Sequence, residues 1–169
     1  MAFYTQASQE MSARIEKNLA YSKGLEKRLR AILDMKFEYF APNRLFLGAL
    51  VRHAADPHHP LSPFSTETTA IRELDMQYFA TALTETHVDL PKDLAPYLPK
   101  LLWLYQMGLI LFWISDRSPG QIRTQRLRNK SLSLLITALK FSSLPFFRPL
   151  RKKIVELLST IEEEEPNLE

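Results

Sequence analysis

The sequence contains no cysteine and only four glycines in 169 residues. The lack of cysteine excludes disulfide frameworks, zinc–thiolate sites and thiol catalysis, and it suits a reducing cytoplasm. Glycine is scarce, and no Asn-Gly or Asp-Gly dipeptide lies between two segments of alternating hydrophobic and polar residues. The hairpin turns of a β-sheet protein are therefore not indicated. We therefore expect an all-α fold.

Strong charge and a targeting leader are also lacking. The net charge of +3 is too small to indicate a nucleic-acid binder. No charged-then-apolar leader with a cleavage site stands at the N-terminus, so a cytoplasmic location is expected. The hydrophobic content of 46% is enough for a sizeable core. A typical domain has roughly 100–200 residues, so one domain is expected.

A long uncharged run, LLWLYQMGLILFWIS at 101–115, lies between Lys100 and the pair Asp116-Arg117. Such a run must be buried in a core, a partner chain or a membrane. A membrane span needs roughly 20 apolar residues, which favours a buried core helix. One small domain can hardly bury every face of this helix, so we expect it to be shared between the core and a dimer interface.

Hydrophobic periodicity and proline breakers divide the chain into helices. Pro96 and Pro99 are tolerated only in the first turns of a helix or at a kink. Ser118-Pro119 is a good helix start, with Ser118 or Asp116 as the cap. Loops are predicted at the proline-rich segment 56–65 and at 87–93. Helices are predicted at about 3–21, 25–40, 44–55, 65–86, from 91 or 93 through the apolar run, 118–142 and 150–161.

The segment LLWLYQMGLILFWISDRSPGQIRTQRL resembles the C-terminal ligand-binding and dimerisation domain of TetR-family transcriptional regulators. In that family an apolar helix ends in a W-x-x-D-R-S-P-G-Q-x-x-T turn. Weaker similarities are KFEYFAPNR with the DPHHPLS loop, and FYTQASQEM. The resemblance covers about residues 1–144. The matching residues are Trp113, Asp116, Arg117, Ser118, Pro119, Gly120, Gln121 and Thr124.

The resemblance implies a single bundle of about six to seven helices that forms a homodimer through a four-helix bundle. It also implies a pocket for a small, mostly apolar effector that controls DNA binding by an N-terminal helix-turn-helix head. The sequence has no such head, so we expect either a trimmed chain or a naturally headless relative. We assign 1–144 to the effector-binding and dimerisation domain. We assign 145–169 to an amphipathic C-terminal helix and acidic tail.

Aromatic side chains are the expected lining of the pocket, although ordinary core packing is the more common role for any one of them. Gln106 is a lone amide in the uncharged run, and a buried amide needs partners. It could bind a ligand, pair across the dimer or bond to backbone. The expected ligand-binding residues are Phe37, Phe40, Phe46, Tyr78, Phe79, Trp103 and Gln106, with Tyr105 as a further candidate. The expected dimer residues are Leu101, Leu104, Leu111, Phe112, Leu132, Leu135, Ile136 and Leu139.

Other candidate sites are weaker. His53, Asp56, His58 and His59 have ligand chemistry but match no structural zinc spacing, so we expect no metal site. We expect no cofactor and no catalysis, because neither paired carboxylates nor an activated nucleophile is evident. The basic residues Arg123, Arg126, Arg128 and Lys130 are expected to form a solvated face, and the last helix to cover the core and not a membrane. The alternatives to a regulator are a helical protein–protein interaction module and a small α-helical enzyme.

Overall fold

The computed structural model describes residues 2–54, 56, 58–84, 86 and 88–163, and of 2–10, 13, 52, 53 and 161–163 it describes only the backbone. These residues form seven α-helices joined by loops and short 3₁₀ turns, and no strand occurs among them. The expected all-α class is confirmed. The helices are α1 (Ala2–Tyr21), α2 (Leu25–Phe40), α3 (Arg44–Ala54), α4 (Thr69–Thr84), α5 (Leu98–Ser115), α6 (Ile122–Ser142) and α7 (Arg148–Glu163).

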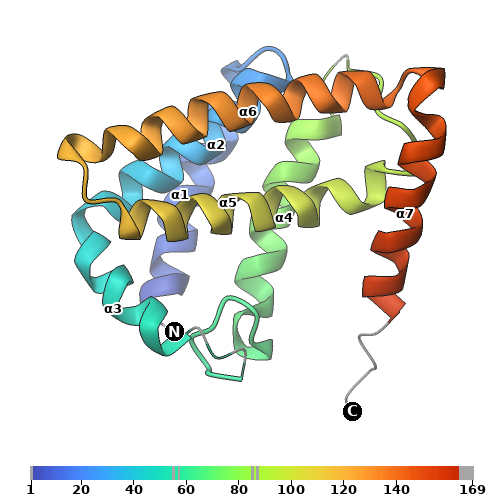
Figure 1. The fold of residues 1–169 in the computed structure, drawn as a ribbon. Coiled ribbons are helices and arrows are strands. Elements are labelled where there is room, and N and C mark those ends of the chain that lie inside the picture. Colours follow the sequence, from blue (N-terminus) through green and yellow to red (C-terminus); the bar gives the residue numbers. More distant parts are fainter. Residues whose placement is uncertain (1, 55, 57, 85, 87, 164–169) are drawn as a thin grey trace.

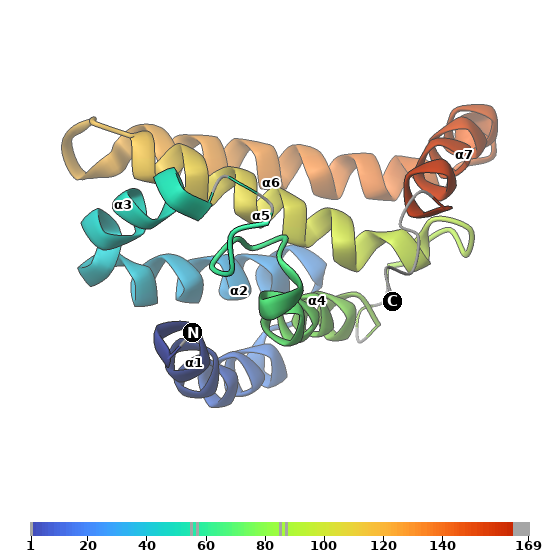
Figure 2. The same cartoon turned by 90° about the horizontal axis from the view of Figure 1, so that it is seen from below.

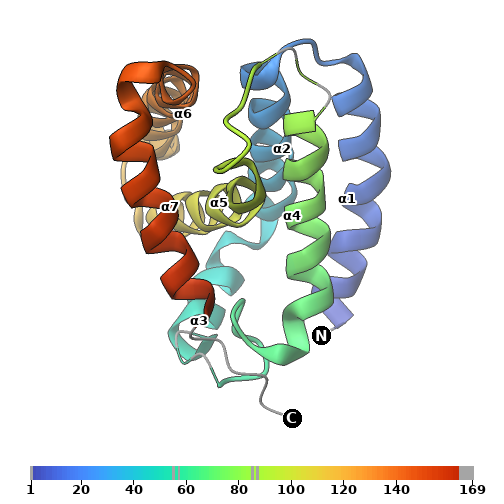
Figure 3. The same cartoon turned by 90° about the vertical axis from the view of Figure 1, so that its right-hand side faces the viewer.

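The helices are arranged in layers around α2, α4 and α5. Helix α1 packs on α2 and α4, and α4 packs in turn on α5. Figure 2 shows α1 on one outer side, α2 and α4 in the middle, and α5 with α6 on the other side. Helix α3 contacts α5 near the α5–α6 turn (Figure 1), and α7 stands at the opposite end of α6 (Figure 1 and Figure 3). The core therefore runs between α1, α2, α4, α5 and the inner face of α6.

Helix α5 carries the uncharged run and crosses the centre of the molecule. Together with the preceding turn, Ala95–Ser115 is the one segment of the described chain that is long and apolar enough to cross a membrane. Its Leu102, Trp103 and Trp113 are buried within the protein. In this fold α5 is thus a core helix. It begins at Leu98, later than predicted, because the residues from 91 to 97 form turns before it.

The turn between α5 and α6 is organised by Asp116. Its Oδ1 accepts hydrogen bonds from the backbone N (2.9 Å) and Oγ (2.7 Å) of Ser118. Its Oδ2 accepts from the N (2.9 Å) and Oγ1 (2.7 Å) of Thr124. Gly120 has a φ of 58°, a left-handed conformation that glycine adopts without strain. Asp116 thus satisfies the N–H of Thr124 in the first turn of α6, and Ser118 Oγ accepts from the N of Arg123 (3.2 Å). Both candidate caps therefore bond to this turn, although the residue directly before the helix is Gln121, whose side chain makes no cap bond.

Hydrogen bonding also sets the ionisation of Asp116. Burial acts to raise its pKa, but the donors of Ser118 and Thr124 together hold the pKa well below the usual 3.8. The carboxylate is therefore charged at neutral pH. Arg44, the first residue of α3, closes the other side of the turn by donating to the carbonyl oxygen of Trp113 from Nε (3.1 Å) and Nη2 (2.8 Å).

Candidate effector-binding cavity

A cavity of about 340 Å³ lies between α3, α4 and α5 and is closed by residues of α1 and α2. Most of its wall is apolar. Helix α3 contributes four residues, α5 contributes a face of large side chains, and the loop before α4 adds Pro63 and Phe64. The main apolar residues of the wall are Phe40, Leu47, Leu50, Val51, Ala54, Phe64, Ile71, Trp103, Met107, Ile110 and Ile114.

Five polar residues lie on the wall, and three of them form one buried cluster. Lys36 of α2 donates from Nζ to Asp75 Oδ1 of α4 at 2.5 Å. Gln106 of α5 donates from Nε2 to Asp75 Oδ2 at 3.2 Å. All three residues line the cavity, and each is buried. These three side chains thus link α2, α4 and α5 by hydrogen bonds on a mostly apolar cavity wall.

The local sequences explain why these polar residues are turned inward. Lys36 lies on the apolar stripe of α2, between buried Leu33 and Phe37. Asp75 lies one helical turn before Tyr78 and Phe79, which are both buried, so it shares their face of α4. Burying a charge is costly unless it is paired, and here the two opposite charges meet.

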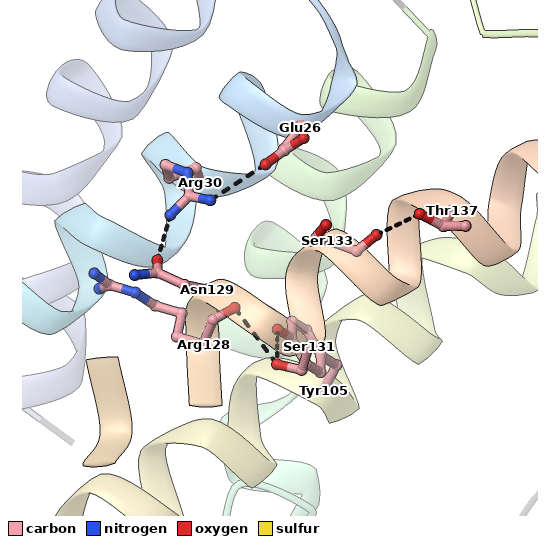
Figure 4. A network of polar contacts seen from close by, with 8 residues as sticks. All are labelled: Glu26, Arg30, Tyr105, Arg128, Asn129, Ser131, Ser133 and Thr137. Carbon is pink, nitrogen blue, oxygen red and sulfur yellow. Dashed lines mark hydrogen bonds and ion pairs between the residues drawn. The ribbon is translucent and has the colours of Figure 1, made fainter. Parts of the chain in front are cut away.

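A second polar network joins α6 to the helices that carry the cavity (Figure 4). Tyr105 Oη of α5 lies 2.7 Å from Ser131 Oγ of α6. Arg30 of α2 donates from Nη1 to Asn129 Oδ1 of α6 at 2.5 Å. Arg128 Nη1 lies 2.8 Å from Asp34 Oδ1. Because Tyr105 is next to Gln106 in α5, the cavity wall and the α6 contact are held by neighbouring residues.

Residues 28–163 match the family described as tetracyclin repressor-like, C-terminal domain. The chain belongs to this family. The match spans most of the chain and includes α7. Domains of this family generally serve ligand binding and dimerisation in transcriptional regulators. No curated protein sequence matches the chain significantly.

Among the expected ligand-binding residues of this tetracyclin repressor-like domain, the structure brings Phe40, Trp103 and Gln106 together on the cavity wall. The other four do not line it. Phe37 packs edge-to-face on Trp113, with ring centroids 5.4 Å apart.

Phe79 is buried in the core, and Phe46 is 52% exposed at the surface. Tyr78 Oη lies 2.5 Å from Ser12 Oγ and so links α4 to α1. Burial raises the pKa of the Tyr78 hydroxyl, which stays neutral. Each of these aromatic side chains thus has a packing or linking position outside the cavity.

Sequence reasoning named neither Lys36 nor Asp75 as a residue of the cavity wall. A signal was available for Lys36, because it is a charged residue whose neighbours three and four residues away, Leu33, Tyr39, Ile32 and Phe40, are apolar or aromatic. From α3 sequence reasoning named Phe46, whereas Leu47, Leu50, Val51 and Ala54 are the residues of that helix on the wall.

The loop between α3 and α4 is held by its own polar side chains. Asp56 Oδ1 accepts from the backbone N of His58 (2.9 Å), and His59 Nδ1 accepts from the N of Leu61 (3.2 Å). The side chain of His53 lies outside the described residues. No group of three potential metal ligands occurs in the part of the chain that the structure describes.

The expected dimer residues divide by exposure. Leu104 and Leu111 are exposed, at 40% and 49%. Leu101, Phe112 and Leu135 are half-buried. The remaining three, Leu132, Ile136 and Leu139, lie in the core of the protomer itself, so they cannot also face a partner. Apolar residues occur on every side of α6, and their spacing alone does not show which side faces inward.

Proposed function

We propose that this chain is the effector-binding and homodimerisation domain of a TetR-like transcriptional regulator. It senses a small, mostly apolar molecule in the cytoplasm and thereby controls DNA binding by a helix-turn-helix domain. The observation that carries this proposal is the mostly apolar cavity of about 340 Å³ with the buried Lys36–Asp75–Gln106 cluster on its wall.

The size and chemistry of the cavity support binding of a small molecule. Ligand sites in proteins occupy about 300–1,000 Å³ and combine apolar walls with a few placed polar groups. Here the apolar contacts of Trp103, Ile110 and Leu50 would supply affinity, and the cluster around Asp75 would supply orientation.

An exposed apolar stripe on α5 and α6 supports dimerisation. On α5 it consists of Leu104, Gly108 and Leu111, and on α6 of Leu127, Leu134, Ala138 and Phe141; all are exposed. We call this set the α5–α6 stripe. Within each helix the members are three, four or seven residues apart, which places them on one face. A two-fold interface uses the same face of both protomers, so one stripe would cover the other.

Helix α5 would connect the two functions. One face of α5 lines the cavity through Trp103, Met107 and Ile110, and Leu104 lies on the exposed face that belongs to the stripe. Leu111 belongs to both, because it borders the cavity and is 49% exposed. A ligand that shifts α5 would therefore alter the geometry between protomers. Such coupling is reciprocal, because DNA binding would change effector affinity by the same factor.

Binding of the neutral fluorescent dye Nile red tests the cavity. We expect saturable binding to the wild-type protein and a loss of affinity of about tenfold or more in Leu50→Trp, because the indole fills space that Leu50 borders. The matched control is Leu45→Trp, on the same helix at a position that is 87% exposed. Equal dye binding by both variants and the wild type, or no binding at all, would overturn the effector-binding proposal.

A further inference from the structure

The amide of Gln106 has one satisfied end and one unsatisfied end. The residue is fully buried, with 0% of its surface exposed. Nε2 donates to Asp75 Oδ2, whereas Oε1 accepts no hydrogen bond from any described part of the chain. A carboxylate can only accept, so it fixes the amide with its nitrogen toward Asp75. The oxygen is left as a free acceptor on a residue of the cavity wall.

An unsatisfied buried acceptor is costly, and it is rare in folded proteins. The other members of the cluster do not relieve it: Lys36 Nζ donates to Asp75 Oδ1, and no donor of the described residues reaches Gln106 Oε1. Because Gln106 lies in a cavity, a donor on a bound molecule can supply the missing hydrogen bond.

The charges around Gln106 indicate that this donor is neutral. Lys36 and Asp75 cancel each other within one ion pair. The one carboxylate among the described wall residues, that of Asp75, is already neutralised by Lys36, so a cationic ligand group would find no free counter-charge there. A carboxylate on the ligand would present no donor to Oε1.

Arg72 is the other cation on the wall. It donates from Nη1 to the carbonyl oxygens of Pro63 (2.9 Å) and Ser65 (3.2 Å) and from Nη2 to Thr69 Oγ1 (3.0 Å). Its guanidinium thus holds the loop before α4, so its presence on the wall is no indication of an anionic ligand.

We propose that the effector is a neutral amphipathic molecule with an apolar body and a hydroxyl or amide N–H that donates to Gln106 Oε1. This inference rests on the proposed effector-binding function. The apolar body lies against Trp103, Phe40 and Ile110, and the donor points toward the Lys36–Asp75–Gln106 cluster. The class comprises phenols, alcohols and amides, and it excludes carboxylates and amines.

Three biphenyl probes that differ in one substituent test the ligand class. They are 4-phenylphenol, 4-methoxybiphenyl and biphenyl-4-carboxylate, titrated against the wild-type protein loaded with Nile red. We expect 4-phenylphenol to displace the dye at a concentration about tenfold or more below that of the other two, because only it carries a neutral donor. Equal or tighter binding of the ether or the carboxylate would overturn the inference.

Gln106→Met tests the residue itself, because methionine keeps the length and volume of the side chain but has no strong acceptor. We expect this variant to lose the preference for the phenol over the ether. The matched control Gln77→Met, the same change at an exposed position of α4 outside the wall of this cavity, should keep it. A phenol preference that persists in Gln106→Met would assign the donor to another acceptor and refute the role of Gln106.

The wild-type comparison needs no variant, so the inference can be tested even if Gln106→Met fails to fold. The results that would refute this inference can also be distinguished from those that would refute the proposed function. If Nile red binds and Leu50→Trp abolishes binding, the cavity is functional. A lack of discrimination among the probes, or no displacement by 4-phenylphenol, then contradicts only the ligand class.

Discussion

Lys36 and Asp75 bring opposite charges into the interior, where each would be costly alone. Their side chains are only 5% and 10% exposed. Taking charges out of water costs several kcal/mol per ion, and the attraction within the pair offsets this loss only when the geometry is good. Here the Nζ–Oδ1 distance of 2.5 Å and the amide of Gln106 supply that geometry.

Removal of one charge should therefore harm the protein more than removal of both. We expect Lys36→Met to lower the free energy of unfolding by about 3–5 kcal/mol, because it leaves Asp75 buried without its cation. The double variant Lys36→Met, Asp75→Leu should recover a large part of this loss. Urea denaturation followed by circular dichroism measures both.

Lys27→Met is the matched control for this series, because Lys27 is exposed on the same helix. We expect it to change stability by no more than about 0.5 kcal/mol. A similar loss in Lys27→Met and Lys36→Met would contradict the importance of the buried pair.

Asp116 contributes to the stability of the folded protein, and this contribution decreases in acid. Its pKa is lower in the folded protein than the ordinary 3.8, so the unfolded state binds protons more readily in acid. The stability that it supplies is complete above about pH 5 and is lost as the pH falls through 3.8 toward the folded pKa. Asp116→Asn should lower the melting temperature by several degrees at pH 7, and the difference from wild type should shrink below pH 4.

Thermal unfolding at a series of pH values checks this expectation, with Asp89→Asn, an exposed position in a loop, as the control. An equal difference in melting temperature between wild type and Asp116→Asn at pH 3 and pH 7 would contradict this expectation. It would mean that the stabilisation by the hydrogen bonds of Asp116 with Ser118 and Thr124 does not depend on the charge of the carboxylate.

Single residues were predictable from sequence where the signal was local. The capping of α6 by Asp116 follows from the Asp-Arg-Ser-Pro-Gly order, because cap and capped groups are neighbours in the chain. The ion pair of Lys36 with Asp75 joins α2 to α4, and no local pattern states that these two positions meet. Phe46 was expected in the cavity and lies at the surface, since an aromatic residue does not specify its helix face alone.

At the level of helices, proline and glycine positions predicted most boundaries. The start of α3 after Pro42 agrees with the structure. Helix α6 was expected to start at Ser118-Pro119 but begins at Ile122, because Pro119–Gln121 forms a separate 3₁₀ turn with positive φ at Gly120 and Gln121. The inward face of α6 was not predictable, because Leu132, Leu134 and Leu135 point in different directions around it. Their exposures, 0% for Leu132 and 70% for Leu134, result from the helices that pack on one side.

Helix α7 has an inner and an outer face whose contributions can be compared directly. Val155 and Leu158 pack against the core, whereas Leu157 is 62% exposed. Leu158→Ala should lower the free energy of unfolding by about 1–2 kcal/mol, less than for a fully buried leucine. Leu157→Ala should cost less than about 0.5 kcal/mol. Chemical denaturation distinguishes the two, and a larger loss in Leu157→Ala would show that its face is covered in solution.

For the whole molecule, the sequence predicted the all-α class and the family, since both depend on patterns that run along the chain. The resemblance implied a pocket, but the sequence could not give its lining, because the wall collects residues from five helices between Met11 and Ile114. The dimer surface expected from the sequence also combined residues of α6 that are buried in the protomer with residues that are not. The α5–α6 stripe replaces that set with residues that are exposed in the protomer.

We expect the protein to be a homodimer at micromolar concentration by light scattering. Leu134→Arg places a charge in the centre of the α5–α6 stripe and should raise the dimer dissociation constant by about 100-fold or more. Ser133→Arg, exposed on another side of α6, is the matched control and should leave the dimer intact. Because Leu134 lies outside the cavity wall, the monomeric variant should still bind Nile red. A wild-type mass that stays monomeric at all concentrations, or a dimer that Leu134→Arg leaves unchanged, would refute this surface while the cavity stands.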